Sequence, residues 1–163
     1  PIFDYCRSYG IRCLYASSSA VHEWWINPYA ITKKVNEVQA PPNSVGMRFF
    51  NVWAEKDSRS DMLYRMLQEN TAKYLTRHRR DWIHVHDVAR AICFLMPDKF
   101  RGVIDVGTGK TTSVLELAEK MGKGHLPIKE DTPGERDETC ADTTELTKLG
   151  WHPTINILDF ASP

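Results

Sequence analysis

The opening third of the chain places a strand, a helix and a second strand in close succession. Residues 12–16 form a short apolar run that stops in three serines, and residues 44–52 form a second one. Between them, Pro28 suits the first position of a helix that continues to Gln39, shortly before two prolines. Strand, helix and strand within about 40 residues are the βαβ unit of a parallel sheet, so we expect an α/β fold.

Polar residues that could carry chemistry follow the first strand and lie on the helix. Ser17 to Ser19 end the strand, and in open α/β sheets ligands bind beyond the carboxyl ends of the strands. Tyr29 and Lys33 are four residues apart, so they share one helix face. An unperturbed phenol titrates near about pH 10, so a tyrosine acting as a base near neutrality needs a positive charge beside it. The same residues also fit a solvated helix face and a turn whose serines satisfy backbone groups.

The rest of the chain alternates helices and strands. We expect a helix at 62–70, strands at 82–85 and 102–107, and helices at 88–96, from 113 to about 122 and at 143–149. Asp87 is a plausible N-cap for one of these helices, and Ser113 with Glu116 forms a capping box for another. A polar loop begins after Ala54, so we predict two parts, residues 1–54 and 55–163.

Composition narrows the class of protein. A chain of 163 residues with 42% hydrophobic content can bury one core of ordinary size. Its 21 basic and 21 acidic residues balance, so no nucleic-acid partner is expected. The apolar stretches are far shorter than the roughly 20 residues of a membrane span, and the first residues lack the pattern of a secretory leader. The same balance of charges favours a small-molecule partner. The four cysteines form no CxxC pair, so we expect reduced thiols and a cytoplasmic location.

Five motifs occur in order across nearly the whole chain. They are YASSSAV at 15–21 with NPYAITKK at 27–34, MRFFNV at 47–52, RDWIHVHDVA at 80–89, VGTG at 106–109, and PGE at 133–135 with the closing LGWHP at 149–153. Together they resemble the extended short-chain dehydrogenase/reductase family, and within it the nucleotide-sugar epimerases and dehydratases. The resemblance implies the C-terminal half of a Rossmann-type parallel sheet plus a small mixed α/β substrate-binding lobe.

The resemblance also implies roles for residues near the first strand and helix. Tyr29 would be the base, and Lys33 would hold the nicotinamide ribose and lower the pKa of the phenol. Ser18 would be the hydroxyl partner. It is preferred over Ser19 because the family's hydroxyl usually lies three residues before a valine, here Val21.

Further residues would contact the ligands. By the same resemblance, Phe49 would line the site of an NAD or NADP cofactor, and Asn51 and Arg80 would contact the diphosphate of a nucleotide-diphosphate sugar, since a guanidinium offers paired donors to phosphate oxygens. Glu135 would also belong to the substrate site.

The implied reaction is transient oxidation of a sugar carbon. Tyr29 would take a hydroxyl proton while the carbon passes a hydride to the cofactor, and return of the hydride to the other face gives epimerisation. Loss of water before that return gives dehydration, the second alternative. The family's dehydratases commonly carry Asp-Glu beside the serine, whereas this chain has Ser19-Ala20, which favours an epimerase.

The family's glycine-rich cofactor-binding turn, of the GxxGxxG type, is absent from these 163 residues. A non-catalytic relative that binds sugar nucleotides or forms dimers is therefore the first alternative to an enzyme. The resemblance implies a homodimer through residues 2–9 and 29–39, and the candidate contact residues are Phe3, Tyr5, Val35 and Val38.

Three further sequence patterns each have a functional and a structural explanation. Residues 107–112 suggest a phosphate-binding loop, but that motif needs a glycine where Ile104 stands. The His-Val-His-Asp run at 84–87 suggests a metal, but no third cluster of ligands follows, so packing and capping are favoured and no metal is expected. Trp24 and Trp25 either cover the substrate or pack within their loop.

Overall fold

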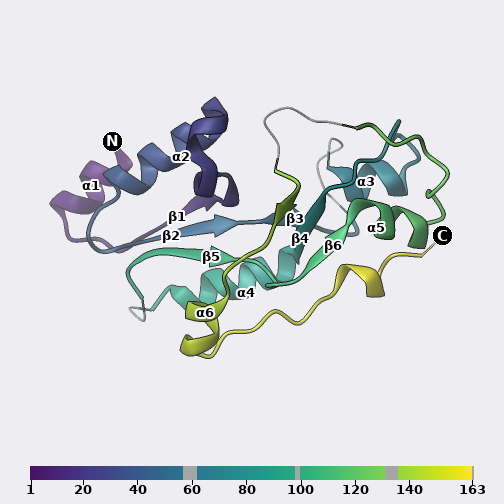
Figure 1. Ribbon diagram of the computed structural model, residues 1–163. Coiled ribbons are helices and arrows are strands. Elements are labelled where there is room, and N and C mark those ends of the chain that lie inside the picture. Colours follow the sequence, from purple (N-terminus) through teal and green to yellow (C-terminus); the bar gives the residue numbers. More distant parts are fainter. Residues whose placement is uncertain (57–61, 98–99, 131–135, 163) are drawn as a thin grey trace.

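The computed structural model describes residues 1–56, 62–97, 100–130 and 136–162. They form two sheets that follow one another along the molecule, with helices above and below the first and beside the second (Figure 1). The mixture of a parallel and a mixed sheet confirms the predicted α/β fold class.

The first sheet is parallel and has the strand order β1-β2-β5. Its strands are β1 (Cys13–Ser18), β2 (Ser44–Phe49) and β5 (Gly102–Val106). Helix α2 (Pro28–Gln39) connects β1 to β2 and confirms the predicted βαβ unit. It begins where expected, because the Asn27 side chain accepts a hydrogen bond from the Ala30 amide at 2.8 Å and Pro28 occupies the first turn.

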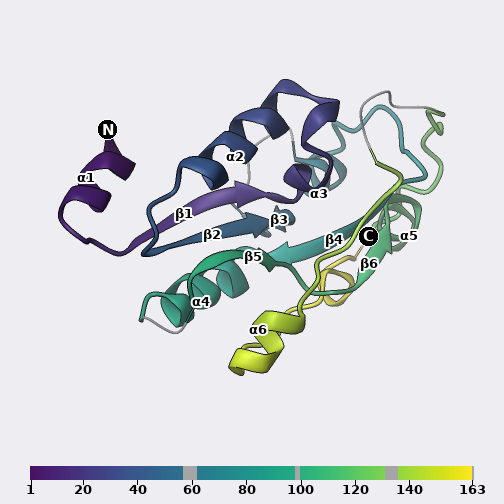
Figure 2. The same cartoon turned by 60° about the vertical axis from the view of Figure 1, so that its left-hand side comes forward.

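Helices cover both faces of the first sheet. Figure 2 shows α2 on one face, and α4 (Val85–Leu95) and α6 (Thr144–Leu149) on the other. Buried apolar residues fill the space between the strands and helices α4 and α6. They include Val45, Met47, Ile104, Val106, Ala91, Leu95, Leu146 and Trp151. Helix α1 (Ile2–Ser8) lies at the far end of the sheet, beyond β1 (Figure 2).

The second sheet is built around β4 (Arg79–His84). It pairs in parallel with β3 (Asn51–Trp53) and with β7 (Glu138–Thr139), and antiparallel with β6 (Thr111–Ser113). Helices α3 (Leu63–Gln68) and α5 (Val114–Lys120) and the short η2 (Ile157–Asp159) pack against it. The second core includes Trp53, Leu67, Leu75, Trp82, Leu117 and Ile157. Ser113 caps α5 as predicted, accepting from the Glu116 amide at 3.0 Å.

Two details of the predicted elements are wrong. The apolar run 44–52 is two strands rather than one, because the chain changes sheets at Phe50, whose amide still bonds the Val106 carbonyl at 3.4 Å. Asp87 is also not an N-cap, since α4 begins at Val85 and the His84 ring accepts from the His86 amide. Instead, the Asp87 carboxylate lies inside the first turn and binds the backbone at Thr154.

The proposed boundary at Ala54 stays a prediction. Strand β5, which follows it in the chain, lies in the same sheet as β1 and β2, so the path of the chain crosses between the sheets more than once. No helix within the described ranges is both long and apolar enough to span a membrane.

Candidate active site

One pocket of about 440 Å³ contains four of the predicted site residues. Ser18, Tyr29, Lys33 and Phe49 all line it, at the carboxyl ends of β1 and β2. Phe50, Val52, Trp53 and Ala54 are among its other walls. The volume is at the lower end of the range for small-molecule sites, which is about 300–1,000 Å³.

Tyr29 and Lys33 lie on the same face of α2, as their spacing predicted. The Lys33 ammonium is 5.7 Å from the centre of the Tyr29 ring, and it donates a hydrogen bond to the Ala16 carbonyl at 3.1 Å. Tyr29 is 55% exposed and lines the pocket, so a ligand can reach it. The ammonium is therefore held between the phenol and the backbone of β1.

The three serines after β1 have different surroundings. Ser18 lines the pocket with Tyr29, and its hydroxyl accepts from the Ala20 amide at 3.2 Å, where it caps the 3-10 helix η1 (Ser19–Ile26). The Ser17 hydroxyl is bound to Glu37, and Ser19 lines a different pocket. Of the two serines considered from sequence, Ser18 is the one beside Tyr29. It also satisfies a backbone group of the turn, as the structural explanation of this serine expected, and its catalytic role stays a prediction.

A second pocket of about 190 Å³ holds the residues predicted to contact a diphosphate. Asn51 and Arg80 line it together with Arg136 and Thr139. Arg80 donates to the Asp137 carbonyl at 3.1 Å, and Arg136 donates to the Ser19 carbonyl at 3.0 Å. Two guanidinium groups at one small pocket suit an anion with several oxygens.

Arg136 was missed from sequence, although it directly follows the PGE motif. Its bond to Ser19 spans 117 residues, which no local pattern shows. Thr139 was missed too. Its hydroxyl is buried, and within the described residues it has no hydrogen-bond partner. Glu135 lies outside the described residues, so its predicted role stays a prediction.

Three other residues considered from sequence, Trp24, Trp25 and His84, do not line either of these two pockets. Trp24 and Trp25 are 42% and 63% exposed and pack edge to face at 6.0 Å, and neither lines either pocket. His84 is buried and bonds Glu55 at 2.9 Å. This hydrogen bond is the main reason that the pKa of Glu55 falls below its ordinary value. In the described part of the chain, no group of three or more His, Cys, Asp or Glu residues could hold a metal ion.

Comparison with known proteins assigns the family. The model of the NAD dependent epimerase/dehydratase family matches residues 1–107. The chain belongs to this family. Members of the epimerase/dehydratase family bind NAD, and the match covers both β1 and α2, which carry Ser18, Tyr29 and Lys33.

Curated relatives and solved structures agree with this assignment. The chain is 34% identical over 87 residues to a putative GDP-L-fucose synthase 2 of Arabidopsis thaliana, a match that covers 49% of the chain and 26% of the relative. Among solved structures it is similar to the NAD dependent NDP-hexosamine 5,6-dehydratase TunA, with TM-score 0.81 and 24% identity over 96% of the chain and 63% of that structure. It is also similar to the UDP-N-acetylglucosamine 4-epimerase of Methanobrevibacter ruminantium M1, with TM-score 0.75 and 20% identity over 98% of the chain and 63% of that structure.

The comparisons show the fold of the chain and how much of its relatives it covers. The structural likeness confirms the predicted Rossmann-type α/β fold. The aligned segment spans about a quarter of the curated relative's length, and the chain covers less than two thirds of either structure. The family's description names both epimerases and dehydratases, and one of each is among the similar structures.

Proposed function

We propose that the chain carries the catalytic and substrate-binding residues of a nucleotide-sugar epimerase that works with NAD or NADP. The observation that supports this most is the convergence of Ser18, Tyr29 and Lys33 on one pocket, with the Lys33 ammonium 5.7 Å from the Tyr29 ring centre. A site that only binds ligands has no physical need for a tyrosine beside a lysine and a serine.

The pocket residues fit a nicotinamide cofactor. Lys33 offers an ammonium donor for ribose hydroxyls, and Phe49 gives an apolar wall beside it. When bound, the cofactor supplies transient oxidation of a sugar carbon. Tyr29 takes the proton of the sugar hydroxyl and later returns it, while the Lys33 charge stabilises the phenolate. The Ser18 hydroxyl orients the reacting oxygen and stabilises its developing charge.

The smaller pocket supports a nucleotide-diphosphate sugar as the substrate class. Arg80 and Arg136 supply fixed positive charge, and Asn51 supplies an amide. Guanidinium groups bind phosphate oxygens through paired hydrogen bonds. We further propose that the protein is a cytoplasmic homodimer, on the cysteine pattern and on the exposed apolar residues of α1 and α2.

A dehydratase is the second candidate, because a dehydratase is among the similar structures. Ser19-Ala20 after Ser18 favours the epimerase, since neither side chain is an acid or base of the strength that removal of water needs.

The first test is titration of the purified chain with NAD and NADP by calorimetry, followed by assays with nucleotide-diphosphate sugars. If turnover is found, Tyr29→Phe should lower kcat at least about a hundredfold, because it removes the group that takes the proton. Tyr74→Phe is a matched control: Tyr74 is also exposed and also lies beside a lysine, Lys129, at 5.0 Å, but it lines neither pocket.

Each outcome has a clear meaning. Cofactor binding and a loss of turnover confined to Tyr29→Phe would support the enzyme. Full activity in Tyr29→Phe would refute the mechanism. A folded chain that binds nucleotide sugars but neither cofactor would support the non-catalytic alternative.

A further inference from the structure

A row of polar side chains crosses the first sheet beneath α2. Ser17, Arg48 and Asp105 are register neighbours on three successive strands, so their side chains share one face of the sheet. Their neighbours on the opposite face, such as Met47 and Ile104, lie in the apolar core. The Arg48 side chain is only 20% exposed, and that of Asp105 is 6% exposed.

Arg48 holds α2 through Glu37. The Glu37 carboxylate, whose side chain is 3% exposed, accepts from Arg48 Nε and Nη2, both at 2.8 Å, and from the Ser17 hydroxyl at 2.6 Å. Burial alone would raise the pKa of Glu37, but the hydrogen bonds from Arg48 and Ser17 bring it below its ordinary value. The hydrogen bonds that Arg48 donates to Glu37 raise the pKa of Arg48, so both groups stay charged near neutrality.

Glu37 continues the face of α2 that carries the proposed catalytic residues. Tyr29, Lys33 and Glu37 are spaced four residues apart, so they lie on successive turns of one face. Lys33 donates to the Ala16 carbonyl and Glu37 accepts from the Ser17 hydroxyl. The helix is thus attached to β1 at the two residues immediately before Ser18.

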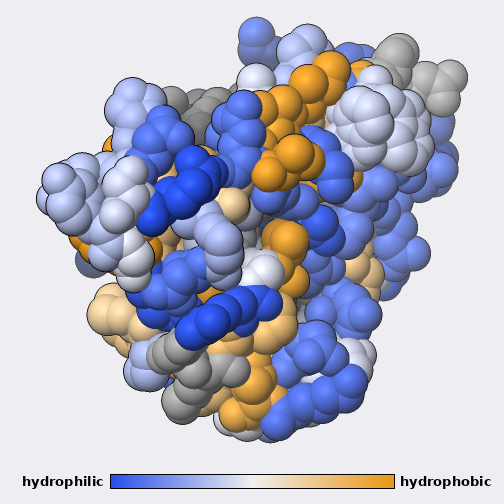
Figure 3. Space-filling view, turned by 90° about the vertical axis from the view of Figure 1, so that its left-hand side faces the viewer, coloured by the Kyte–Doolittle hydropathy of each residue, from blue (hydrophilic) through white to orange (hydrophobic). Residues whose placement is uncertain are grey.

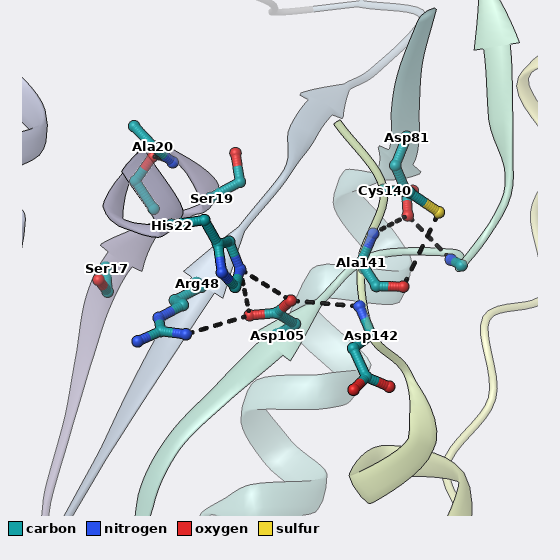
Figure 4. Close-up of polar contacts among 12 residues, drawn as sticks. Ser17, Ser19, Ala20, His22, Arg48, Asp81, Asp105, Cys140, Ala141 and Asp142 are labelled. Atoms are coloured by element: carbon teal, nitrogen blue, oxygen red, sulfur yellow. Dashed lines mark hydrogen bonds and ion pairs between the residues drawn. The ribbon is translucent and has the colours of Figure 1, made fainter. Parts of the chain in front are cut away.

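Arg48 also reaches the segment between Ser18 and Tyr29. Its Nη1 lies 3.8 Å from Asp105, whose carboxylate contacts His22 Nε2 at 3.0 and 3.1 Å and accepts from the Asp142 amide at 3.2 Å. Figure 4 shows His22 and Arg48 both pointing toward Asp105. His22 lies in η1, which starts directly after Ser18 and ends before Asn27, the N-cap of α2.

We propose that Arg48 is a positioning residue, which holds α2 through Glu37 and η1 through Asp105 and His22, and so fixes where Tyr29 and Lys33 lie relative to Ser18. This inference rests on the proposed function. A guanidinium suits this role because two of its planar donors bind the Glu37 carboxylate in fixed directions while its charge attracts Asp105 at 3.8 Å, whereas an ammonium is a point charge on a flexible stem. Misplacement of catalytic groups by about 1 Å can cost a hundredfold in rate.

The test compares Arg48→Lys and Glu37→Gln with Arg77→Lys as a control. Arg77 forms a similar ion pair with Glu130, at 3.0 Å, but both side chains are more than 60% exposed and neither lines the proposed site. Two kinds of measurement are made on each folded variant. Kinetics gives kcat and KM, and NMR without ligand gives the signals of the Tyr29 ring and the Lys33 side chain.

Arg48→Lys and Glu37→Gln should lower kcat at least about tenfold with KM nearly unchanged, because the catalytic groups move while the diphosphate pocket stays intact. Both should shift the Tyr29 and Lys33 signals, and Arg77→Lys should do neither. Glu37→Gln keeps an oxygen acceptor for Arg48, so it serves where Arg48→Lys does not fold.

The NMR measurement does not depend on turnover. If the unaltered chain proves inactive, the proposed function fails, yet shifted Tyr29 and Lys33 signals would still support the positioning role. Folded variants in which those signals and kcat stay at the values of the unaltered chain would overturn it, whatever happens to thermal stability.

Discussion

At the scale of single residues, one buried carboxylate explains why the Gly-Thr-Gly turn at 107–109 is not a phosphate site. Asp81 is fully buried and accepts from the Thr108 amide and hydroxyl, both at 2.7 Å, and from the Gly109 amide at 2.8 Å. It also accepts from the Ala141 amide at 3.1 Å. The amides that would bind a phosphate in a P-loop are therefore directed inward. A Cβ at Gly107 would lie 2.5 Å from that of Ala141 and 2.7 Å from an Asp81 oxygen, so only glycine fits there.

Asp81→Asn should destabilise the protein by about 3 kcal/mol, because an amide NH₂ would face donors that need an acceptor in a buried place. Urea unfolding measures the change. Asp4→Asn is the control, since the Asp4 side chain is 75% exposed, and it should alter the free energy of unfolding by less than about 0.5 kcal/mol. A loss below about 1 kcal/mol in Asp81→Asn would contradict the structural role given to Asp81.

At the scale of elements, what could be predicted from sequence was local. The βαβ unit, the Asn27-Pro28 start of α2 and the shared face of Tyr29 and Lys33 depend on residues a few positions apart, and the structure has all three. The break at Phe50 could not be predicted, because an unbroken apolar run does not show which sheet each half will join.

Asp87 is a second case in which the sequence could not show a contact between distant residues. Its residue type and place before a helix suggested a cap, but its actual partners are the amides of Thr154 and Ile155, 67 and 68 residues away. The carboxylate thereby fixes the segment after α6 against α4. Arg136 and the ion pair of Arg48 with Asp105 were missed for this reason too, since their partners lie in distant segments.

The Asp87 contacts predict a dependence of stability on pH. Burial raises the pKa of Asp87, but hydrogen bonds from the Thr154 and Ile155 amides and from Arg90 outweigh it, so the folded pKa lies below the ordinary 3.8. The stabilisation is therefore complete above the unfolded pKa and is lost as the pH falls through the folded pKa.

Asp87→Asn should accordingly cost about 2 kcal/mol near pH 7, and the difference from the unaltered protein should shrink as the pH falls below about 4. Urea unfolding at a series of pH values measures this difference. Glu145→Gln is the control, because the Glu145 side chain is 53% exposed. If the loss in free energy of unfolding caused by Asp87→Asn stayed constant from neutral to acid pH, Asp87 would not be the ionised, hydrogen-bonded carboxylate described above.

At the scale of the whole molecule, the proposed active site depends on the change of sheet at Phe50. Ser18 and Phe49 end strands of the first sheet, and Trp53 ends a strand of the second, yet all three line one pocket. Met62 and Val85 also line this pocket. Because the pocket lies where the sheets meet, each of the two cores supports one of its walls. Destabilising either core should therefore loosen the pocket.

The outer side of α1 and α2 leads to a prediction about assembly. Ile2, Tyr5, Val35 and Val38 are 74%, 58%, 43% and 74% exposed. Figure 3, which looks onto this end of the molecule, shows apolar residues gathered between hydrophilic ones. Exposed apolar patches of this kind mark interaction surfaces, and a second copy of the chain is the partner we propose.

Val38→Lys should weaken the proposed dimer at least about tenfold, because it buries a charge in an apolar contact. The substitution suits folding, since Val38 lies in the last turn of α2, where a positive charge interacts well with the helix dipole. Ile128→Lys is the control: Ile128 is 41% exposed and lies on the second sheet's side of the molecule, paired with Leu75. Sedimentation velocity over a range of concentrations measures both. A dimer that Val38→Lys leaves intact would place the interface elsewhere, and an unaltered chain that stays monomeric at every concentration would refute the dimer itself.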